Sequence, residues 1–154
     1  MPAMHKQPVL RAEVRVGVSP QQARDWFLSL ADHPERYQFE SHAGFTFTEG
    51  QFGEPGARFQ TTERFLGVPA TLKFELTSVS EDRFSFRLRR PLRAVWGYFE
   101  LEPAGAGETR LTLAIGSHRR LTRIFLRHPL VRRAVQQQIN GEVAHIKQSM
   151  ESLA

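Results

Sequence analysis

The chain has 154 residues, the length of a single domain that can bury one hydrophobic core. It contains no cysteine, which excludes disulfides and thiolate metal sites, and its 40% hydrophobic and 24% charged residues are typical of a globular protein. No apolar run approaches the ~18 residues of a membrane span, and the N-terminus lacks the apolar core of a signal peptide. We therefore expect one domain, residues 1–154, in the cytoplasm.

The net charge of +5 comes mainly from one segment near the C-terminus. Six arginines and no acidic residue lie between positions 119 and 133: Arg119, Arg120, Arg123, Arg127, Arg132 and Arg133. Such a basic segment can contact an anionic membrane surface, a phosphate or an acidic partner, or it can be the solvated face of a helix. Nucleic acid is a less favoured partner, because the segment lacks the interleaved aromatic residues of a single-strand binding surface.

The first predicted elements are a strand and two short helices. Residues 9–18 alternate between apolar and polar side chains, which indicates a half-buried strand. Ser19 is a suitable N-cap for a helix, with Pro20 at the first helical position and Gln22 three residues after the cap. The inward face of that helix consists of Ala23, Trp26, Phe27 and Leu30. A second short helix is predicted over Pro34–Tyr37.

From residue 43 to residue 117 the pattern is one of strands and turns. Alternating apolar residues at Phe45 and Phe47 are followed by a loop rich in glycine and proline. Further strands, separated by short turns, are predicted over 57–66, 70–79, 83–90, 93–102 and 108–117. Short connections between successive strands favour an antiparallel meander.

A long amphipathic helix is predicted from Pro129 to Leu153. Its apolar residues advance by three or four positions and form one stripe: Val131, Val135, Ile139, Val143, Ile146, Met150 and Leu153. At 1.5 Å per residue this helix is about 36 Å long, enough to cover the apolar face of a sheet. We therefore expect an α+β fold in which a curved seven-stranded antiparallel sheet wraps around the C-terminal helix, with two short helices between strands 1 and 2.

A curved sheet held away from a helix leaves an apolar cavity, which is the usual site for a small molecule. The inward residues of the sheet and helix, with their polar neighbours, are therefore the predicted ligand-binding residues. They are Trp26, Phe59, Thr61, Glu63, Phe65, Phe74, Leu76, Phe84, Phe86, Leu88, Arg90, Phe99, Leu113, Arg132, Val135, Ile139, Glu142 and Val143. The alternative is that the phenylalanines interdigitate and fill the core.

Glu63 shares one face of its strand with residues that are expected to point inward: Phe59, Thr61 and Phe65. A buried carboxylate is costly unless it is protonated or paired with a cation, and Arg90 and Arg132 are the candidate cations. Such a group could anchor a carbonyl or hydroxyl group of a ligand, or act as a general acid or base, which makes Glu63 the candidate catalytic residue. The alternatives are a structural salt bridge and a bulge that turns Glu63 outward.

No metal site and no cofactor are expected. The six histidines show neither H-x-x-x-H nor H-E-x-x-H spacing, so a helix-borne zinc site has no support. The glycines at 50, 53 and 56 do not precede a helix that begins with Lys-Ser or Lys-Thr, so they are not a phosphate-binding loop. No G-x-S-x-G nucleophile elbow is present.

Two stretches of sequence resemble the START-like superfamily, also called SRPBCC. The first runs from Val18 to Gln22, continues with Trp26-Phe27 and ends with residues 30–37, Leu-Ala-Asp-His-Pro-Glu-Arg-Tyr. It is similar to the strand-to-helix entry and helix-breaking segment of that superfamily. The second, residues 91–103 followed by 108–111, is similar to its penultimate hairpin. The resemblance covers nearly the whole chain.

The resemblance implies a helix-grip fold with a hydrophobic cavity that holds a lipid, polyketide, quinone or similar apolar molecule. Some members of the superfamily catalyse reactions in this cavity, and many only bind or carry. We therefore expect a carrier or sensor of a small hydrophobic molecule. The alternative is an enzyme of the polyketide cyclase, aromatase or dehydratase type. The superfamily has no universal catalytic motif, so no catalytic residues can be transferred from it.

Overall fold

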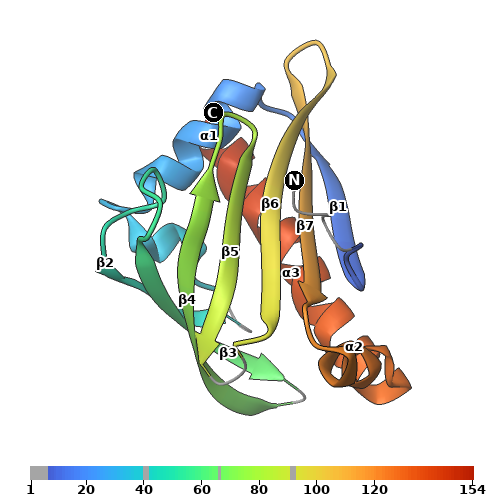
Figure 1. Cartoon of the computed structure of the whole chain (residues 1–154). Coiled ribbons are helices and arrows are strands. Elements are labelled where there is room, and N and C mark those ends of the chain that lie inside the picture. Colours follow the sequence, from blue (N-terminus) through green and yellow to red (C-terminus); the bar gives the residue numbers. More distant parts are fainter. Residues whose placement is uncertain (1–6, 40–41, 66, 91–92) are drawn as a thin grey trace, which may run out of the picture.

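The computed structural model describes residues 7–39, 42–65, 67–90 and 93–154. Strand β1 (Leu10–Val16) is followed by helix α1 (Pro20–Ser29) and a short 3-10 helix, η1 (Pro34–Tyr37). The next strands are β2 (His42–Glu49), β3 (Arg58–Phe65), β4 (Val68–Val79), β5 (Arg83–Arg90), β6 (Val95–Gly105) and β7 (Glu108–Ser117). The chain ends in helices α2 (Arg120–Arg127) and α3 (Pro129–Ser152) (Figure 1). In the part of the chain that the structure describes, no helix has both the length and the hydrophobicity of a membrane span.

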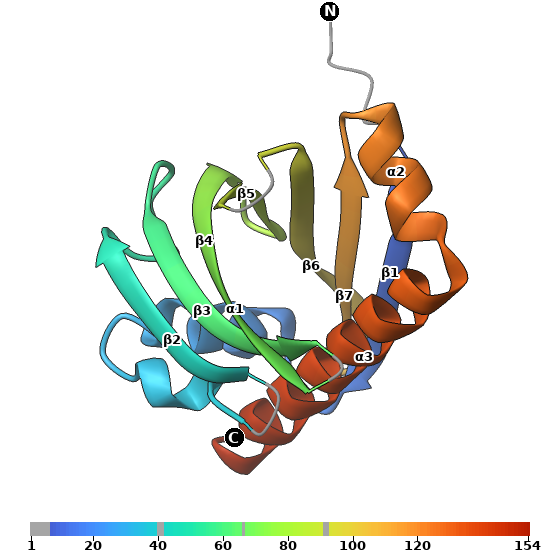
Figure 2. The same cartoon turned by 90° about the horizontal axis from the view of Figure 1, so that it is seen from below.

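The strands form one antiparallel sheet in the order β1-β7-β6-β5-β4-β3-β2. The chain therefore runs as a meander from β2 to β7, and β1 joins the far edge beside β7. The sheet is strongly curved, and α3 lies across its concave side (Figure 2). This architecture confirms the predicted α+β helix-grip fold, with two short helices between strands 1 and 2.

The segment between β1 and β2 adopts the predicted helices. Ser19 caps α1 as expected, because its Oγ accepts from the backbone N–H of Gln22 at 3.2 Å and its own N–H donates to Gln22 Oε1 at 2.9 Å. The second helix is a single 3-10 turn. It delivers Tyr37, which is 4% exposed, to the interior of the molecule.

The interior beneath α1 is filled by aromatic rings. The Phe27 ring lies 5.1 Å from Phe84 and 5.0 Å from Phe99, measured between ring centroids. Phe52 packs on the same ring at 5.6 Å. Phe27, Phe52 and Phe84 are at most 1% exposed. Solid packing by interdigitated phenylalanines, the alternative considered from the sequence, therefore holds for this end of the interior.

The second half of α3 is held firmly against the rest of the molecule. Ile146 and Met150 are at most 3% exposed, and the Trp26 indole N–H donates to Ser149 Oγ at 2.8 Å. In the first half of the helix, Val131 and Val135 are only half-buried. The apolar stripe of α3 therefore packs fully at its C-terminal end and faces a more open interior at its N-terminal end.

Helix α2 is an addition to the predicted elements, because the predicted C-terminal helix begins only at Pro129. The backbone at His128 is extended, with φ −59° and ψ 131°. A residue before proline is disfavoured in the helical region, so the chain turns at this point. As a result α2 projects from the end of β7 at an angle to α3 (Figures 1 and 2).

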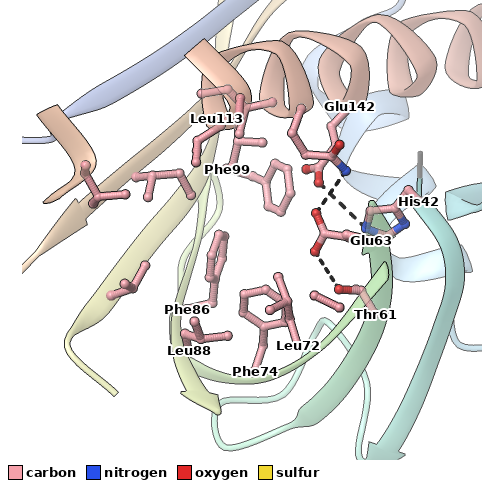
Figure 3. Close-up of a pocket in the computed structure, with 18 of the residues that line it drawn as sticks. His42, Thr61, Glu63, Leu72, Phe74, Phe86, Leu88, Phe99, Leu113 and Glu142 are labelled. Atoms are coloured by element: carbon pink, nitrogen blue, oxygen red, sulfur yellow. Dashed lines mark hydrogen bonds and ion pairs between the residues drawn. The ribbon is translucent and has the colours of Figure 1, made fainter. Parts of the chain in front are cut away.

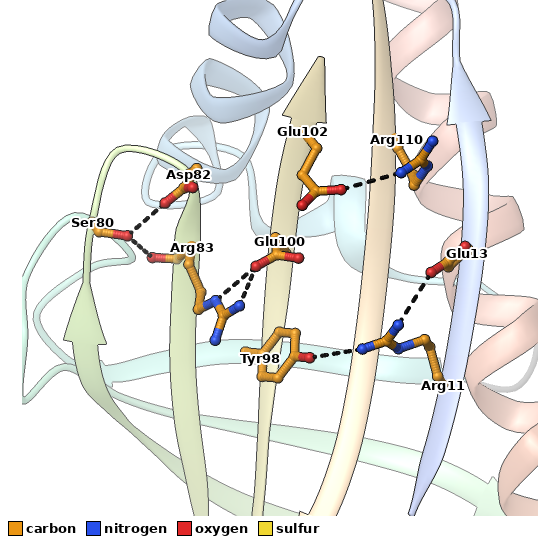
Figure 4. Close-up of polar contacts among 9 residues, drawn as sticks. All are labelled: Arg11, Glu13, Ser80, Asp82, Arg83, Tyr98, Glu100, Glu102 and Arg110. Atoms are coloured by element: carbon orange, nitrogen blue, oxygen red, sulfur yellow. Dashed lines mark hydrogen bonds and ion pairs between the residues drawn. The ribbon is translucent and has the colours of Figure 1, made fainter. Parts of the chain in front are cut away.

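The outer face of the sheet is covered by polar contacts (Figure 4). Arg83 pairs with Glu100, and its guanidinium lies 4.1 Å from the centre of the Tyr98 ring. Arg11 Nη2 donates to the Tyr98 hydroxyl at 3.3 Å. These arginines leave Tyr98 only 8% exposed although it points away from the core, which explains how an aromatic residue is accommodated on this face.

Candidate ligand-binding cavity

A cavity of about 470 Å³ lies between the concave face of the sheet and helices α2 and α3 (Figure 3). Strands β3 to β7 form one wall, and α2 and the first half of α3 form the other. Most of the predicted ligand-binding residues line it: Phe59, Thr61, Glu63, Phe74, Phe86, Leu88, Phe99, Leu113, Val135, Ile139 and Glu142. That these residues bind a ligand stays a prediction, and the structure brings them together around one space.

Other predicted site residues are buried in the packed core. Trp26, Leu76, Phe84 and Val143 are at most 4% exposed and are not among the lining residues. They support the cavity wall from behind. The side chain of Phe65, at the end of β3, lies outside what the structure describes.

The two predicted cations are not in the cavity. Arg90 and Arg132 are both exposed, so the expectation that either points inward is corrected. The pairing of β4 with β5 shifts between Lys73 and Phe74, which face Arg90 and Leu88, so β5 has one extra residue there. This bulge reverses the side-chain alternation after Leu88 and turns Arg90 outward. Arg132 lies one position after Val131, roughly 100° around the helix from the lining face.

Several lining residues were not in the predicted set. Tyr37 and Phe52 come from η1 and from the loop before β3, where no periodic pattern identifies an inward side chain. His42 starts β2, and the alternation that makes Phe45 inward would place it outward. The pairing with β3 shifts between His42 and Gly44, and this irregularity turns the imidazole inward. Gln138 precedes Ile139 on α3 and is a polar residue beside the apolar stripe.

A polar cluster occupies the inner end of the cavity (Figure 3). It consists of His42, Thr61, Glu63, Gln138 and Glu142, each at most 7% exposed. Thr61 Oγ1 donates to Glu63 Oε2 at 2.6 Å, and Gln138 Nε2 donates to Glu63 Oε1 at 3.2 Å. Glu63 therefore points inward, as predicted. Its hydrogen-bond partners are the neutral donors Thr61 and Gln138 instead of an arginine.

The second carboxyl group of the cluster is equally enclosed. The Tyr37 hydroxyl donates to Glu142 Oε2 at 3.2 Å, and His42 Nε2 lies 3.7 Å from Glu142 Oε1. His42 Nδ1 is 2.8 Å from the backbone carbonyl oxygen of Tyr37. Because a carbonyl oxygen can only accept, Nδ1 carries the proton of this hydrogen bond. His42, Glu63 and Glu142 each have one nitrogen or oxygen atom within 4.8 Å of the others, a grouping of potential metal ligands that sequence spacing did not show.

Burial controls the protonation of this cluster. It raises the pKa of Glu142 well above its ordinary value, and the negative charge of Glu63 and a hydrogen bond to it act in the same direction. Burial also raises the pKa of Tyr37, and it lowers the pKa of His42 despite the nearby charge of Glu63. Both shifts favour the uncharged forms, the protonated carboxyl group of Glu142 and the neutral imidazole of His42.

The mouth of the cavity lies at α2 and the start of α3. Phe125 and Leu130 line the cavity and are still 54% and 68% exposed. Leu121, 80% exposed, and Ile124, 54% exposed, extend this apolar surface along α2. The apolar face and the arginines of the 119–133 segment therefore occur together beside the entrance.

Several solved structures have the same fold as this chain. TTHA0849 from Thermus thermophilus is 16% identical, with a TM-score of 0.72 over 94% of this chain and 98% of that one. An aromatase/cyclase from a Streptomyces species is 11% identical, with a TM-score of 0.69 over 92% of each chain. Norcoclaurine synthase from Thalictrum flavum, in complex with dopamine and hydroxybenzaldehyde, is 14% identical, with a TM-score of 0.68 over 94% of this chain and 84% of that one. At such identities the likeness concerns the fold alone.

A search of curated protein sequences found no match. The family described as "Polyketide cyclase / dehydrase and lipid transport" matches residues 7–151, nearly the whole chain. The motifs around Trp26 and in the β6–β7 hairpin, the helix-grip architecture and the apolar cavity agree with this match. The chain therefore belongs to the polyketide cyclase / dehydrase and lipid transport family of the START-like superfamily.

Proposed function

We propose that the protein binds one small, mainly apolar molecule in the cavity and acts as its carrier or sensor. The observation that carries this proposal is a cavity of about 470 Å³ whose walls are aromatic and aliphatic and whose polar groups gather at one end. This volume lies within the ordinary range of ligand sites, about 300–1,000 Å³. An apolar body bound between the phenylalanines would have one polar group facing the cluster.

The chemistry of the cluster restricts that polar group. Protonated Glu142 can donate to a carbonyl oxygen, and Glu63 can accept from a hydroxyl group. Among the lining residues that the structure describes there is no arginine or lysine, so a ligand carboxylate at this end would meet two acidic side chains without a cation. A neutral ligand with a hydroxyl or carbonyl group, such as a phenol or a polyketide, fits better than a free fatty acid inserted head-first.

In this proposal the protein takes up or releases its ligand while α2 is bound to an anionic membrane surface. Leu121, Ile124 and Phe125 are spaced at i, i+3 and i+4 and form one exposed apolar face of α2. Arginines are close to that face in the sequence, and Arg120, Arg127, Arg132 and Arg133 are all exposed. Apolar residues for shallow insertion and basic residues for lipid head groups are the two components of interfacial membrane binding.

Occupation of the cavity can be tested with two matched substitutions. Leu72→Trp adds an indole inside the cavity, whereas Leu153→Trp adds one at an exposed position directly after the last residue of α3. We expect the first variant to bind an apolar fluorescent dye at least tenfold more weakly and the second to bind like the wild type. Native mass spectrometry of the wild type should detect a bound apolar molecule, and solvent extraction should release it. Equal dye binding by both variants, or none by the wild type, would contradict the proposal.

A second candidate function is an enzyme of the aromatase/cyclase or dehydratase type. The observation that favours it is the buried pair Glu63 and Glu142 at the end of an apolar cavity, where two carboxyl groups lie side by side and burial raises the pKa of Glu142. In such an enzyme Glu142 would protonate a carbonyl oxygen and Glu63 would remove a proton from the neighbouring carbon. Loss of turnover of a polyketide-type substrate in Glu63→Gln, with binding retained, would select this function over the carrier.

A further inference from the structure

We propose that His42, Glu63 and Glu142 bind one divalent transition-metal ion at the inner end of the cavity, with an open coordination position toward the cavity. The three residues come from β2, β3 and α3, and one ligand atom of each lies within 4.8 Å of the other two. One imidazole and two carboxylates with a free position match the catalytic metal sites in which three protein ligands leave room for water or substrate. This inference does not depend on which apolar ligand the cavity takes.

The orientation of His42 is the first argument. Its Nδ1–H donates to the Tyr37 carbonyl oxygen at 2.8 Å, which leaves Nε2 of the neutral ring with a free lone pair. That lone pair faces the cluster, and Glu142 Oε1 is 3.7 Å away, too far for a hydrogen bond. A metal-bound histidine has this arrangement, because its other ring nitrogen is normally held by a backbone carbonyl or a carboxylate.

The support around the two carboxylates is the second argument. Thr61 and Gln138 donate to the two oxygens of Glu63, and the Tyr37 hydroxyl donates to Glu142. Hydrogen bonds of this kind fix the direction of metal-ligating carboxylates and lower the cost of assembling the site. The same backbone segment, through Tyr37, therefore positions both His42 and Glu142.

The charge balance is the third argument. Glu63 and Glu142 are 4% and 7% exposed, and no arginine or lysine lines the cavity in the ranges that the structure describes. Two carboxylates buried side by side repel each other unless a cation lies between them, and a divalent ion would neutralise both. The ligand set of one nitrogen and two carboxylates suits zinc, manganese or iron(II), whereas calcium requires six to eight oxygen ligands.

The test uses the untagged full-length chain, freed of metal with a chelator and titrated with ZnCl2 or MnCl2 alone by calorimetry. We expect one ion per chain and weaker binding as the pH falls, because protons compete for the same ligand atoms. His42→Gln and Glu142→Gln should each weaken binding at least tenfold. The matched control is the double variant His33→Gln, Glu35→Gln, which removes an exposed histidine–glutamate pair at 3.1 Å and should bind like the wild type.

Two results would overturn the site. One is that neither zinc nor manganese binds stoichiometrically to the wild type. The other is unchanged affinity in both His42→Gln and Glu142→Gln, which would place the ion at surface histidines. Circular dichroism of each variant establishes that it is folded before titration, and Glu142→Gln, which removes a buried acid, is expected to stay folded. Dye binding is measured separately, so failure of the metal site and failure of the apolar-ligand proposal give different results.

Discussion

The surroundings of Glu142 favour its protonated form, because the residue is only 7% exposed and its carboxyl group lies beside a second one. Burial and the charge of Glu63 raise its pKa well above the ordinary value. The folded protein therefore keeps a proton that the unfolded chain releases above a pKa of about 4.3. Since the folded state binds more protons, this group favours folding at low pH, and its contribution is lost as the pH rises through the raised pKa.

We predict that Glu142→Gln makes the metal-free protein less sensitive to alkaline pH. Glutamine occupies the same volume, can accept from Tyr37 and carries no proton to lose. The melting temperature of the variant should therefore exceed that of the wild type at pH 8–9, and the difference should shrink toward pH 5. Thermal unfolding in EDTA over this pH range measures it. Glu81→Gln, at an exposed turn, should follow the wild type, and a pH-independent difference for Glu142→Gln would contradict the prediction.

Phenylalanines in the packed part of the interior and at the cavity wall should contribute differently to stability. Phe27 is fully buried among aromatic rings, so Phe27→Ala should lower the free energy of unfolding by about 3–5 kcal/mol. Phe74 is half-buried and borders an existing space, so Phe74→Ala should cost less than half as much. Urea unfolding of both variants gives the two values. Equal costs would indicate that the cavity is filled or collapsed in solution.

At the scale of single elements, α2 exposes both apolar and basic side chains on one short helix. Its apolar residues Leu121, Ile124 and Phe125 are at least 54% exposed, while Arg120 and Arg127 lie on the same eight-residue helix. The turn at His128-Pro129 separates it from α3 and keeps this face beside the cavity mouth. A bilayer surface would cover the apolar face and pair with the arginines at the same time.

We predict that the double variant Arg120→Glu, Arg127→Glu binds vesicles of 30% anionic lipid at least tenfold more weakly than the wild type. Each basic residue near an anionic surface contributes about 1 kcal/mol, and charge reversal replaces attraction with repulsion. Cosedimentation measures the partition coefficient. Binding by the wild type should also fall as salt is raised, because head-group attraction is screened.

A matched control for this experiment reverses the same number of charges elsewhere. Arg15 and Arg110 face each other at the end of β1 and β7 that is remote from α2. Both are exposed and form surface ion pairs, with Glu108 and Glu102, and Arg15 also donates to the Ala104 carbonyl oxygen. Such exposed contacts contribute little to stability, so replacement of both residues by glutamate should leave the fold intact. This variant should keep most of the vesicle binding. An equal loss in both double variants would show that net charge, and not α2, determines binding.

At the scale of the whole molecule, the interior is divided between a solid end and a hollow end. The solid end includes α1, the phenylalanines around Phe27 and the last turns of α3, and the hollow end includes α2 and the first half of α3. Segments with fewer buried contacts open at a lower free-energy cost than a packed core. The hollow end should therefore be the part of the protein whose stability responds to a ligand.

We predict that an apolar ligand slows amide hydrogen exchange mainly in residues 120–139. A bound molecule would fill the space against Leu126, Val135 and Ile139 and restore the contacts that this half of the helical wall lacks. Exchange in residues 20–29 of α1 should change little, because those residues already pack on aromatic rings. Mass spectrometry of exchanged peptides, with and without ligand, compares the two segments. Equal protection of both would contradict the division of the interior.

The sequence by itself determined the architecture and all the elements except α2, because these depend on local side-chain periodicity. The alternation in residues 9–18, the cap at Ser19 and the stripe from Val131 to Met150 each act within a few residues. The requirement that one long helix cover a curved apolar sheet then restricted how the elements combine. Short turns between successive strands further favoured the meander that the structure has.

The tertiary structure alone decided which polar groups meet and which rings leave a space. One-residue shifts in strand pairing turned His42 inward and Arg90 outward, and no periodic pattern contains such shifts. The contact between Glu63 and Glu142 joins residues far apart in the chain, so it depends on how α3 is set across β3. The physical reason is that period and capping act along the chain, whereas the shape of the cavity depends on the distance and angle between separate elements.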